Sequence, residues 1–140
     1  MNSINSLNSI EINEQYNGIT INASFNSKLN ILVGDSGTGK TLLLSAIDLY
    51  CLNNNISCRL CNYNDANLSP EQIKAICAGA DILLLDNADL YMNNSLLKEL
   101  LTTSQLIILN MKDTSYINTN HHSEQYIVDY INLSLTVRKI

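Results

Sequence analysis

The sequence has few basic residues, and they do not cluster. Lysine and arginine together number 8, against 13 acidic residues, and the net charge at pH 7 is −5. A chain of this charge offers no basic surface to a nucleic-acid backbone, so we do not expect it to bind nucleic acid directly. Arginine is especially scarce, with only Arg59 and Arg138. An arginine that acts on a ligand must therefore be one of these two or come from a partner.

Long apolar runs are missing as well. No segment is both long and apolar enough to span a bilayer, and the N-terminus lacks the charged-then-apolar pattern of a secretory signal. We therefore expect a cytoplasmic protein without a transmembrane segment, in which cysteines are kept as reduced thiols. The four cysteines are Cys51, Cys58, Cys61 and Cys77.

What the chain does contain is enough apolar material for one core. Its hydrophobic fraction of 46% and charged fraction of 15% are typical of a globular protein. With 140 residues, a single domain over residues 1–140 is expected, because there is no room for a separate substrate domain.

Short apolar segments alternate with helical patterns along most of the chain. Asn17-Gly18 between two alternating runs predicts an antiparallel β-hairpin over residues 11–25. Further strands are predicted at 29–33, 56–61, 82–85 and 105–109, helices at 39–52, from Ser69 (a capping box with Gln72) and at 94–102, a loop at 112–122, and one or two strands at 126–139. Strands that alternate with helices predict an α/β fold with a parallel core of four or five strands. In the first helix, the residues expected to face the core are Leu42, Leu43, Ala46, Ile47 and Tyr50.

The segment between the predicted strand at 29–33 and the helix after it carries the strongest functional signal. Its residues match the phosphate-binding pattern G-x-x-x-x-G-K-[ST] in full: Gly34, Asp35, Ser36, Gly37, Thr38, Gly39, Lys40 and Thr41. The glycines let backbone N–H groups and the helix N-terminus approach phosphate oxygens closely. We expect Lys40 to contact the β- and γ-phosphates and the Thr41 hydroxyl to bind Mg²⁺.

A phosphate-binding loop with this pattern, called a P-loop, needs a carboxylate that orients Mg²⁺. This carboxylate usually lies at the end of another apolar strand. Asp86 follows four apolar residues and ends the next predicted strand but one after the P-loop strand. We therefore predict that Asp86 is the second protein ligand of Mg²⁺.

Together these segments resemble the P-loop NTPases, in the division that includes ABC-type, RecA-like and AAA+ ATPases. SKLNILVGDSGTGKTLLLSAI behind a hairpin and DILLLDNADL are similar to the opening and the Walker B segment of ABC-type and SMC- or RecF-like proteins. The resemblance covers residues 11–110 and implies a three-layer α/β fold, with the strand at 105–109 lying between the P-loop strand and the Walker B strand. It also implies that Asn110 senses the γ-phosphate and that Tyr16 stacks on adenine, although a tyrosine beside a hairpin turn also packs against a sheet.

The chain departs from these families at the residue after the Walker B aspartate. They carry a catalytic glutamate there, and this chain has Asn87. An amide orients water but does not accept a proton, and general-base catalysis is worth typically ~10²–10⁴-fold in rate. Asp89 is the nearest carboxylate that can substitute, so the candidate catalytic residues are Asn87, Asp89 and the sensor Asn110. The ABC signature, a serine-glycine-glycine-glutamine run, is missing.

Cys58 and Cys61 look like half a zinc site, with His121-His122 as the other candidate pair. Residues i and i+3 of a strand face opposite sides, which suits neither chelation nor a disulfide. We therefore interpret the two cysteines as small apolar residues that fill space in a buried strand. The two histidines are interpreted as part of a solvated loop.

The sequence thus predicts a P-loop protein that binds ATP and Mg²⁺. Adenine is favoured because the N-K-x-D guanine signature is absent. Three functions stay open: a slow ATPase that a partner activates, a nucleotide-dependent binding module without turnover, and a kinase for a small acceptor. The kinase is disfavoured, since there is little room for a lid and no basic cluster for a second phosphate. A homo-oligomer or a protein partner that completes the site also stays open.

Overall fold

The computed structural model describes residues 9–34, 39–112 and 123–140. Its strands and helices are β1 (Ile10–Tyr16), β2 (Ile19–Phe25), β3 (Leu29–Val33), α1 (Lys40–Asn53), β4 (Cys58–Cys61), α2 (Pro70–Cys77), β5 (Ile82–Leu85), α3 (Asn94–Thr103), β6 (Leu106–Asn110), β7 (Ser123–Ile131) and β8 (Ser134–Lys139), with short 3-10 helices η1 (Tyr63–Asp65) and η2 (Ala88–Leu90). The predicted hairpin, strands and helices are confirmed with shifts of one or two residues at most ends. The predicted loop, including His121 and His122, lies almost wholly outside the described residues.

The N-terminal hairpin forms because Asn17 and Gly18 accept left-handed backbone angles. Their φ values are 52° and 81°, and Tyr16 pairs directly with Ile19 across the turn. A two-residue turn with positive φ at both positions matches the right-handed twist of the strands that it joins. The local sequence is therefore sufficient to fix this hairpin.

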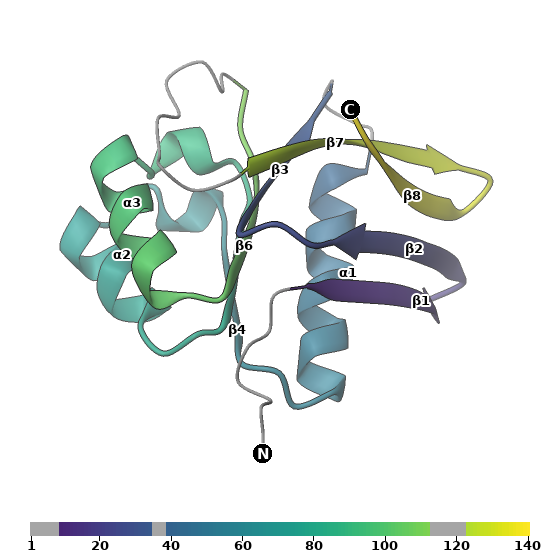
Figure 1. Cartoon of the computed structure of the whole chain (residues 1–140), viewed down its shortest axis with the longest axis horizontal. Helices are drawn as coiled ribbons and strands as arrows, with labels where there is room; N and C mark the ends of the chain where they lie inside the picture. Colours follow the sequence, from purple (N-terminus) through teal and green to yellow (C-terminus); the bar gives the residue numbers. More distant parts are fainter. Residues whose placement is uncertain (1–8, 35–38, 113–122) are drawn as a thin grey trace.

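One sheet contains every strand, in the order β1-β2-β8-β7-β3-β6-β5-β4. The strands from β7 to β4 are all parallel, so the predicted parallel core is confirmed with five strands. β6 lies between β3 and β5, as the resemblance implies. The sequence did not predict that β2 pairs with β8 in parallel, which joins the two hairpins and extends the sheet beyond the parallel core (Figure 1).

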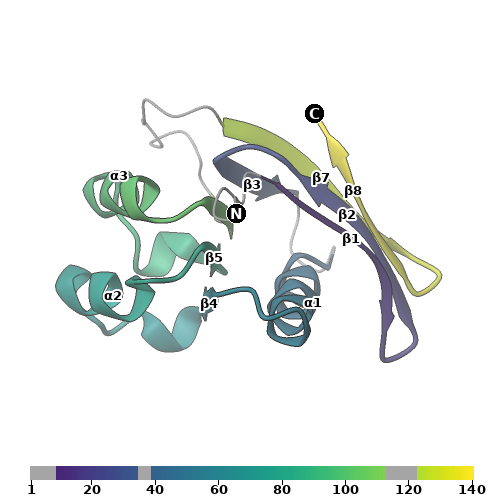
Figure 2. The same cartoon turned by 60° about the horizontal axis from the view of Figure 1, so that its bottom comes forward.

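Helices cover both faces of the parallel part of the sheet. α1 lies on one face, in the hollow formed where the sheet curls through β7, β8, β2 and β1, and α2 and α3 lie on the other face (Figure 2). The side chains of β5 alternate accordingly. Ile82 and Leu84 pack with α1, whereas Leu83 and Leu85 pack with α2 and α3. This is why the strand is apolar at every position.

The buried side of α1 differs from the prediction at Leu42 and Tyr50. The buried residues are Leu43, Leu44, Ala46, Ile47 and Cys51. Leu42 is 37% exposed, and Tyr50 is only partly buried against the core. α1 is also the longest helix of the described residues, with 14 residues, and no described helix is long and apolar enough to cross a membrane.

The second predicted helix begins as its capping box indicates. The Ser69 hydroxyl accepts a hydrogen bond from the Gln72 N–H at 3.2 Å, and the Gln72 side chain accepts one from the Ser69 N–H at 2.8 Å. Both groups satisfy N–H donors that the first turn of a helix otherwise leaves without partners. Pro70 occupies the first helical position, where its missing N–H costs nothing.

The cysteines of β4 face opposite sides of the sheet, as their spacing predicts. Cys58 contacts Cys51 of α1, and the Cys61 sulfur lies 3.9 Å from that of Cys77 in α2. The hydrogen bond with Cys77 and burial both raise the pKa of the Cys61 thiol. Among the described residues no group of three or more histidine, cysteine or acidic side chains is arranged to hold a metal ion.

Candidate nucleotide site

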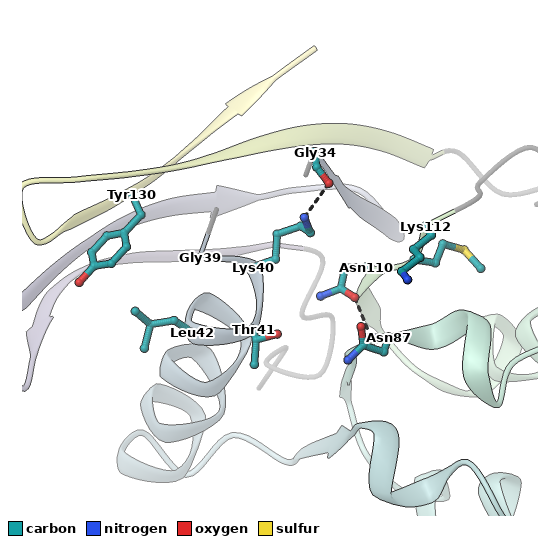
Figure 3. Close-up of a pocket in the computed structure, with 10 residues that line it drawn as sticks. Gly34, Gly39, Lys40, Thr41, Leu42, Asn87, Asn110, Lys112 and Tyr130 are labelled. Atoms are coloured by element: carbon teal, nitrogen blue, oxygen red, sulfur yellow. Dashed lines mark hydrogen bonds between the residues drawn. The ribbon is translucent and has the colours of Figure 1, made fainter. Parts of the chain in front are cut away.

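Three parallel strands end at the same edge of the sheet, and each is followed by polar residues. β3 leads to Gly34, β5 to Asp86, and β6 ends with Asn110. A cavity of about 680 Å³ opens at this edge, within the roughly 300–1,000 Å³ of small-molecule sites. The described residues that line it are Gly34, Gly39, Lys40, Thr41, Leu42, Asn87, Asn110, Met111, Lys112 and Tyr130 (Figure 3).

The two ends of the predicted phosphate loop are held close to each other. The Lys40 ammonium donates a hydrogen bond to the carbonyl of Gly34 at 2.7 Å. Gly39 has a φ of 96° and precedes α1 without a side-chain cap on the helix. The first N–H groups of α1 therefore face the cavity edge, where a helix N-terminus favours an anion. Asp35, Ser36, Gly37 and Thr38 lie outside the described residues.

Thr41 and Asp86 are brought together across the sheet edge. The Thr41 hydroxyl donates to Asp86 Oδ1 at 3.2 Å, and the Asn110 amide donates to the same oxygen at 2.6 Å. Asp86 is 4% exposed, so these two donors replace the water that a carboxylate normally binds. The sequence predicted that Thr41 and Asp86 act on one ion, and the fold puts their oxygens within contact distance.

Asn110 also fixes the residue after Asp86. Its side-chain oxygen accepts a hydrogen bond from the backbone N–H of Asn87 at 2.7 Å. Asn87 has a φ of 52°, in the left-handed region that asparagine tolerates better than most residues. The Asn87 side chain lines the cavity. Asp89 does not line it, because η2 begins at Ala88 and carries the chain away from the strand ends.

Tyr91 supports this region, and sequence reasoning missed it. Its hydroxyl lies 2.7 Å from the carbonyl of Asp86 and 3.1 Å from the carbonyl of Cys61, as a donor to both. Burial raises the pKa of Tyr91 far above its ordinary value, so the phenol keeps the proton that these carbonyls accept. Tyr91 thereby ties the end of β5 to the end of β4. Nothing near Tyr91 in the sequence indicates this long-range contact.

The structure does not bring Tyr16 to the cavity. Its hydroxyl donates to Glu14 at 2.9 Å, and its pKa is raised to about 12 by partial burial and by that hydrogen bond, with smaller effects of Tyr50 and Cys51. Those last two residues lie near the end of α1, about 15 Å along the helix from Lys40. β1 runs beside α1, so its last residue packs far from the loop. The prediction that Tyr16 stacks on adenine is therefore wrong in this structure.

Three further cavity residues, Met111, Lys112 and Tyr130, were not anticipated. Tyr130 comes from β7, which continues beyond the end of β3: Val33 pairs with Ile127, three residues earlier. Lys112 follows β6 and lines the cavity beside Asn110. The sequence held no signal for Tyr130, since its position depends on the pairing of β7 with β3.

Both arginines of the chain lie elsewhere. Arg59 donates to the carbonyl of Ile76 at 3.1 Å, and Arg138 pairs with Asp129 at 3.4 Å on the surface. Neither lines the cavity. Neither arginine therefore contributes a guanidinium group to this cavity.

A glycine-rich loop between β3 and α1, a carboxylate after β5, and β6 inserted between those two strands define a P-loop fold. No protein-family model matches the sequence, and no curated protein is similar to it in sequence. In structure the chain is similar to a DNA replication initiation factor, with a TM-score of 0.52 and 21% identity over 62% of this chain and 32% of that one. It is also similar to AMPPCP-bound DnaA from Aquifex aeolicus, with a TM-score of 0.50, 22% identity and the same two coverages.

The matched region thus spans about one third of each of these two proteins. At such low identity the likeness concerns the fold alone. It supports the P-loop fold that the strand order and the loop motif indicate. It does not support the finer placement beside ABC-type or SMC-like proteins that the sequence resemblance implied.

Proposed function

We propose that this protein is a single three-layer P-loop domain, residues 1–140, that binds ATP together with Mg²⁺ in the cavity at the strand ends. The observation that carries the proposal is the convergence of Lys40, Thr41 and Asp86 at one edge of the sheet. Each is of the type that a bound nucleotide requires: a cation for phosphate, and a hydroxyl and a carboxylate for the metal. AMPPCP, which one structural neighbour contains, is an analogue of ATP and favours the adenine nucleotide.

The donor set suits Mg²⁺. Thr41 Oγ1 and Asp86 Oδ1 are 3.2 Å apart, close to the roughly 2.9 Å between adjacent ligands of an octahedral Mg²⁺. A single carboxylate with phosphate oxygens and water is a usual Mg²⁺ environment, whereas an all-protein cage is not. When bound, the ion neutralises phosphate charge; Thr41 and Asp86 supply the protein oxygens that hold it.

The phosphates extend between Lys40 and the Asn110 end of the cavity. In this arrangement the Lys40 ammonium leaves the Gly34 carbonyl for the β- and γ-phosphates, and Lys112 adds a second positive charge. The Asn110 amide nitrogen carries two N–H groups, and Asp86 accepts a hydrogen bond from one of them. We assign the other to the γ-phosphate, which gives Asn110 its sensing role.

Turnover at this site is slow or depends on a partner. Asn87 stands at the cavity wall where the related families use a glutamate, and an amide is no general base. Neither arginine of the chain reaches the cavity. A second copy or another protein that supplies an arginine completes the site if hydrolysis is needed. The amide at Asn87 and the lack of an arginine at the cavity also favour a second function. In this function the protein is a nucleotide-dependent binding module, and ATP binding alone changes its assembly. A kinase is disfavoured, as no further basic cluster is available.

The central test is a calorimetric titration of the intact protein with ATP and with GTP, each with and without Mg²⁺. We expect saturable binding of one ATP per chain that Mg²⁺ strengthens. A protein that binds neither nucleotide contradicts the proposal. Mass measurement in solution during the same titration shows whether ATP changes assembly, and phosphate release from the same samples separates the binding module, which releases none, from an ATPase.

Replacing Asp86 by asparagine is expected to remove the effect of Mg²⁺ on ATP binding. An amide is a weaker ligand for a hard cation than a carboxylate, so the gain from Mg²⁺ falls by about tenfold or more, equivalent to ~1.4 kcal/mol. The measurement is ATP affinity in Mg²⁺ against ATP affinity in a chelator.

Asp81→Asn is the matched control, since Asp81 is exposed and lies at the other end of the same strand. Thermal unfolding checks that each variant is folded, because Asp86 is buried and accepts two hydrogen bonds. An Asp86→Asn protein that keeps the full Mg²⁺ effect removes Asp86 from the metal site.

A further inference from the structure

The cavity has two chemically different ends. Lys112, Asn110 and Asn87 lie to one side of Lys40, whereas Tyr130 and Leu42 lie to the other (Figure 3). The first end is charged and polar. The second is an aromatic ring beside an aliphatic side chain, both more than one third exposed, at 38% and 37%. This second end has no part in binding phosphate or metal.

We propose that Tyr130 stacks on the base of the bound nucleotide, with Leu42 as the apolar contact beside it. The proposal rests on the proposed function, because it takes its direction from the phosphates. Lys40 contacts the β- and γ-phosphates, and the γ-phosphate faces Asn110. The ribose and base then extend to the opposite side of Lys40, where Tyr130 and Leu42 lie.

The position of Tyr130 is set by the sheet. Tyr130 pairs with Leu135 in the β7–β8 hairpin, and both residues pack on Gly39, the last residue before α1. A Cβ atom at Gly39 would lie 2.7 Å from Leu135 Cδ2 and 3.2 Å from Tyr130 Cβ. The hairpin therefore packs tightly on Gly39, and a side chain at this position would require Leu135 and Tyr130 to shift. The Tyr130 side chain therefore leaves β7 directly beside Gly39, next to the start of α1.

Stacking also fits the chemistry of this end of the cavity. Every base has a π-face, and an aromatic ring binds it without reading its edge. A half-exposed ring next to a half-exposed leucine offers such a face, and covering both side chains removes apolar surface from water. Neither Leu42 nor Tyr130 belongs to the two buried clusters of the described residues.

The test compares a ligand with a base and one without. Calorimetry measures the affinities of MgATP and magnesium tripolyphosphate for the natural protein, Tyr130→Ala and Tyr130→Phe. We expect Tyr130→Ala to weaken ATP binding by roughly 5- to 150-fold, the range for one stacked base, with tripolyphosphate binding unchanged. Tyr130→Phe keeps the ring and retains ATP affinity. Tyr63→Ala is the control, because Tyr63 is 63% exposed and does not line the cavity.

The outcomes separate this inference from the proposed function. A natural protein that binds neither ligand overturns both. A natural protein that binds ATP, together with a Tyr130→Ala protein that binds it equally well, overturns only the stacking role. An equal loss of ATP and tripolyphosphate affinity also overturns it, since Tyr130 then merely supports the loop.

A second readout uses the absence of tryptophan from the chain. Tyr130→Trp introduces the only indole, whose emission we expect to change when ATP binds and to stay constant with tripolyphosphate. Tyr63→Trp is expected to respond to neither ligand. If calorimetry shows that the Tyr130→Trp protein binds ATP but its emission does not change, then this position does not contact the base.

Discussion

Replacing Lys40 by alanine abolishes ATP binding, which is the largest effect that we expect from one substitution. Lys40 carries the only charged side chain among the described loop residues, and it already contacts the other end of the loop at Gly34, 2.7 Å away. A hydrogen bond to a charged group contributes about 1.5–3 kcal/mol, and Lys40 serves two phosphates. Affinity is therefore expected to fall by roughly 10²–10⁴-fold. Calorimetry with MgATP measures it.

The control for Lys40→Ala is Lys98→Ala, on the exposed face of α3. Both variants are expected to unfold at nearly the natural temperature, because neither side chain belongs to the core. ATP should raise the unfolding temperature of the natural protein and of Lys98→Ala by mass action, and leave that of Lys40→Ala unchanged. A Lys40→Ala protein that ATP still stabilises contradicts the assigned phosphate contact.

Features that depend on neighbouring residues could be predicted from the sequence. The Asn17-Gly18 turn follows from the backbone angles that these residues tolerate, and the start of α2 follows from the reciprocal bonds of Ser69 and Gln72. The position of Asp86 at a strand end follows from the apolar run before it. In each case the cause lies within a few residues, so one short segment contains the whole argument.

Features that depend on sheet pairing could not be predicted. Tyr130 reaches the cavity because β7 pairs with β3 and extends past it, and Tyr91 matters because β4 and β5 end side by side. Tyr16 shows the opposite error. Its place upstream of the loop suggested an adenine contact, but β1 runs beside α1 and places Tyr16 near Tyr50 and Cys51, at the far end of that helix. Sequence spacing does not determine which strands become neighbours.

The identification of the class shows the same division. The loop motif and the carboxylate are local, and they predicted the P-loop fold. The choice of a subfamily within that division of P-loop proteins depends on the arrangement of whole elements, and the structural neighbours do not support the ABC- or SMC-like placement that the sequence resemblance implied. The strand order, with β6 between β3 and β5, is common to that whole division, so it does not decide between its subfamilies.

Replacing Asn87 by glutamate is expected to raise the rate of ATP hydrolysis by about 10²-fold or more, within the range for general-base catalysis. The Asn87 side chain lines the cavity, and its backbone N–H is held by Asn110 at 2.7 Å, a contact that a substitution of the side chain leaves in place. A carboxylate at this position accepts the proton of the attacking water, which the natural amide does not. Phosphate release at saturating MgATP measures the rate.

Backbone strain determines which comparisons are informative. Asn87 has a φ of 52°, and a residue other than glycine, asparagine or aspartate costs roughly 1–2 kcal/mol in that region. Asn87→Gln is the matched control, since it shares the length and the strain of glutamate without a basic group, and it should stay slow. Asn87→Asp avoids the strain but has the shorter side chain. If the natural protein already releases phosphate as fast as Asn87→Glu, then Asn87 does not limit the chemistry, and the site is a working ATPase.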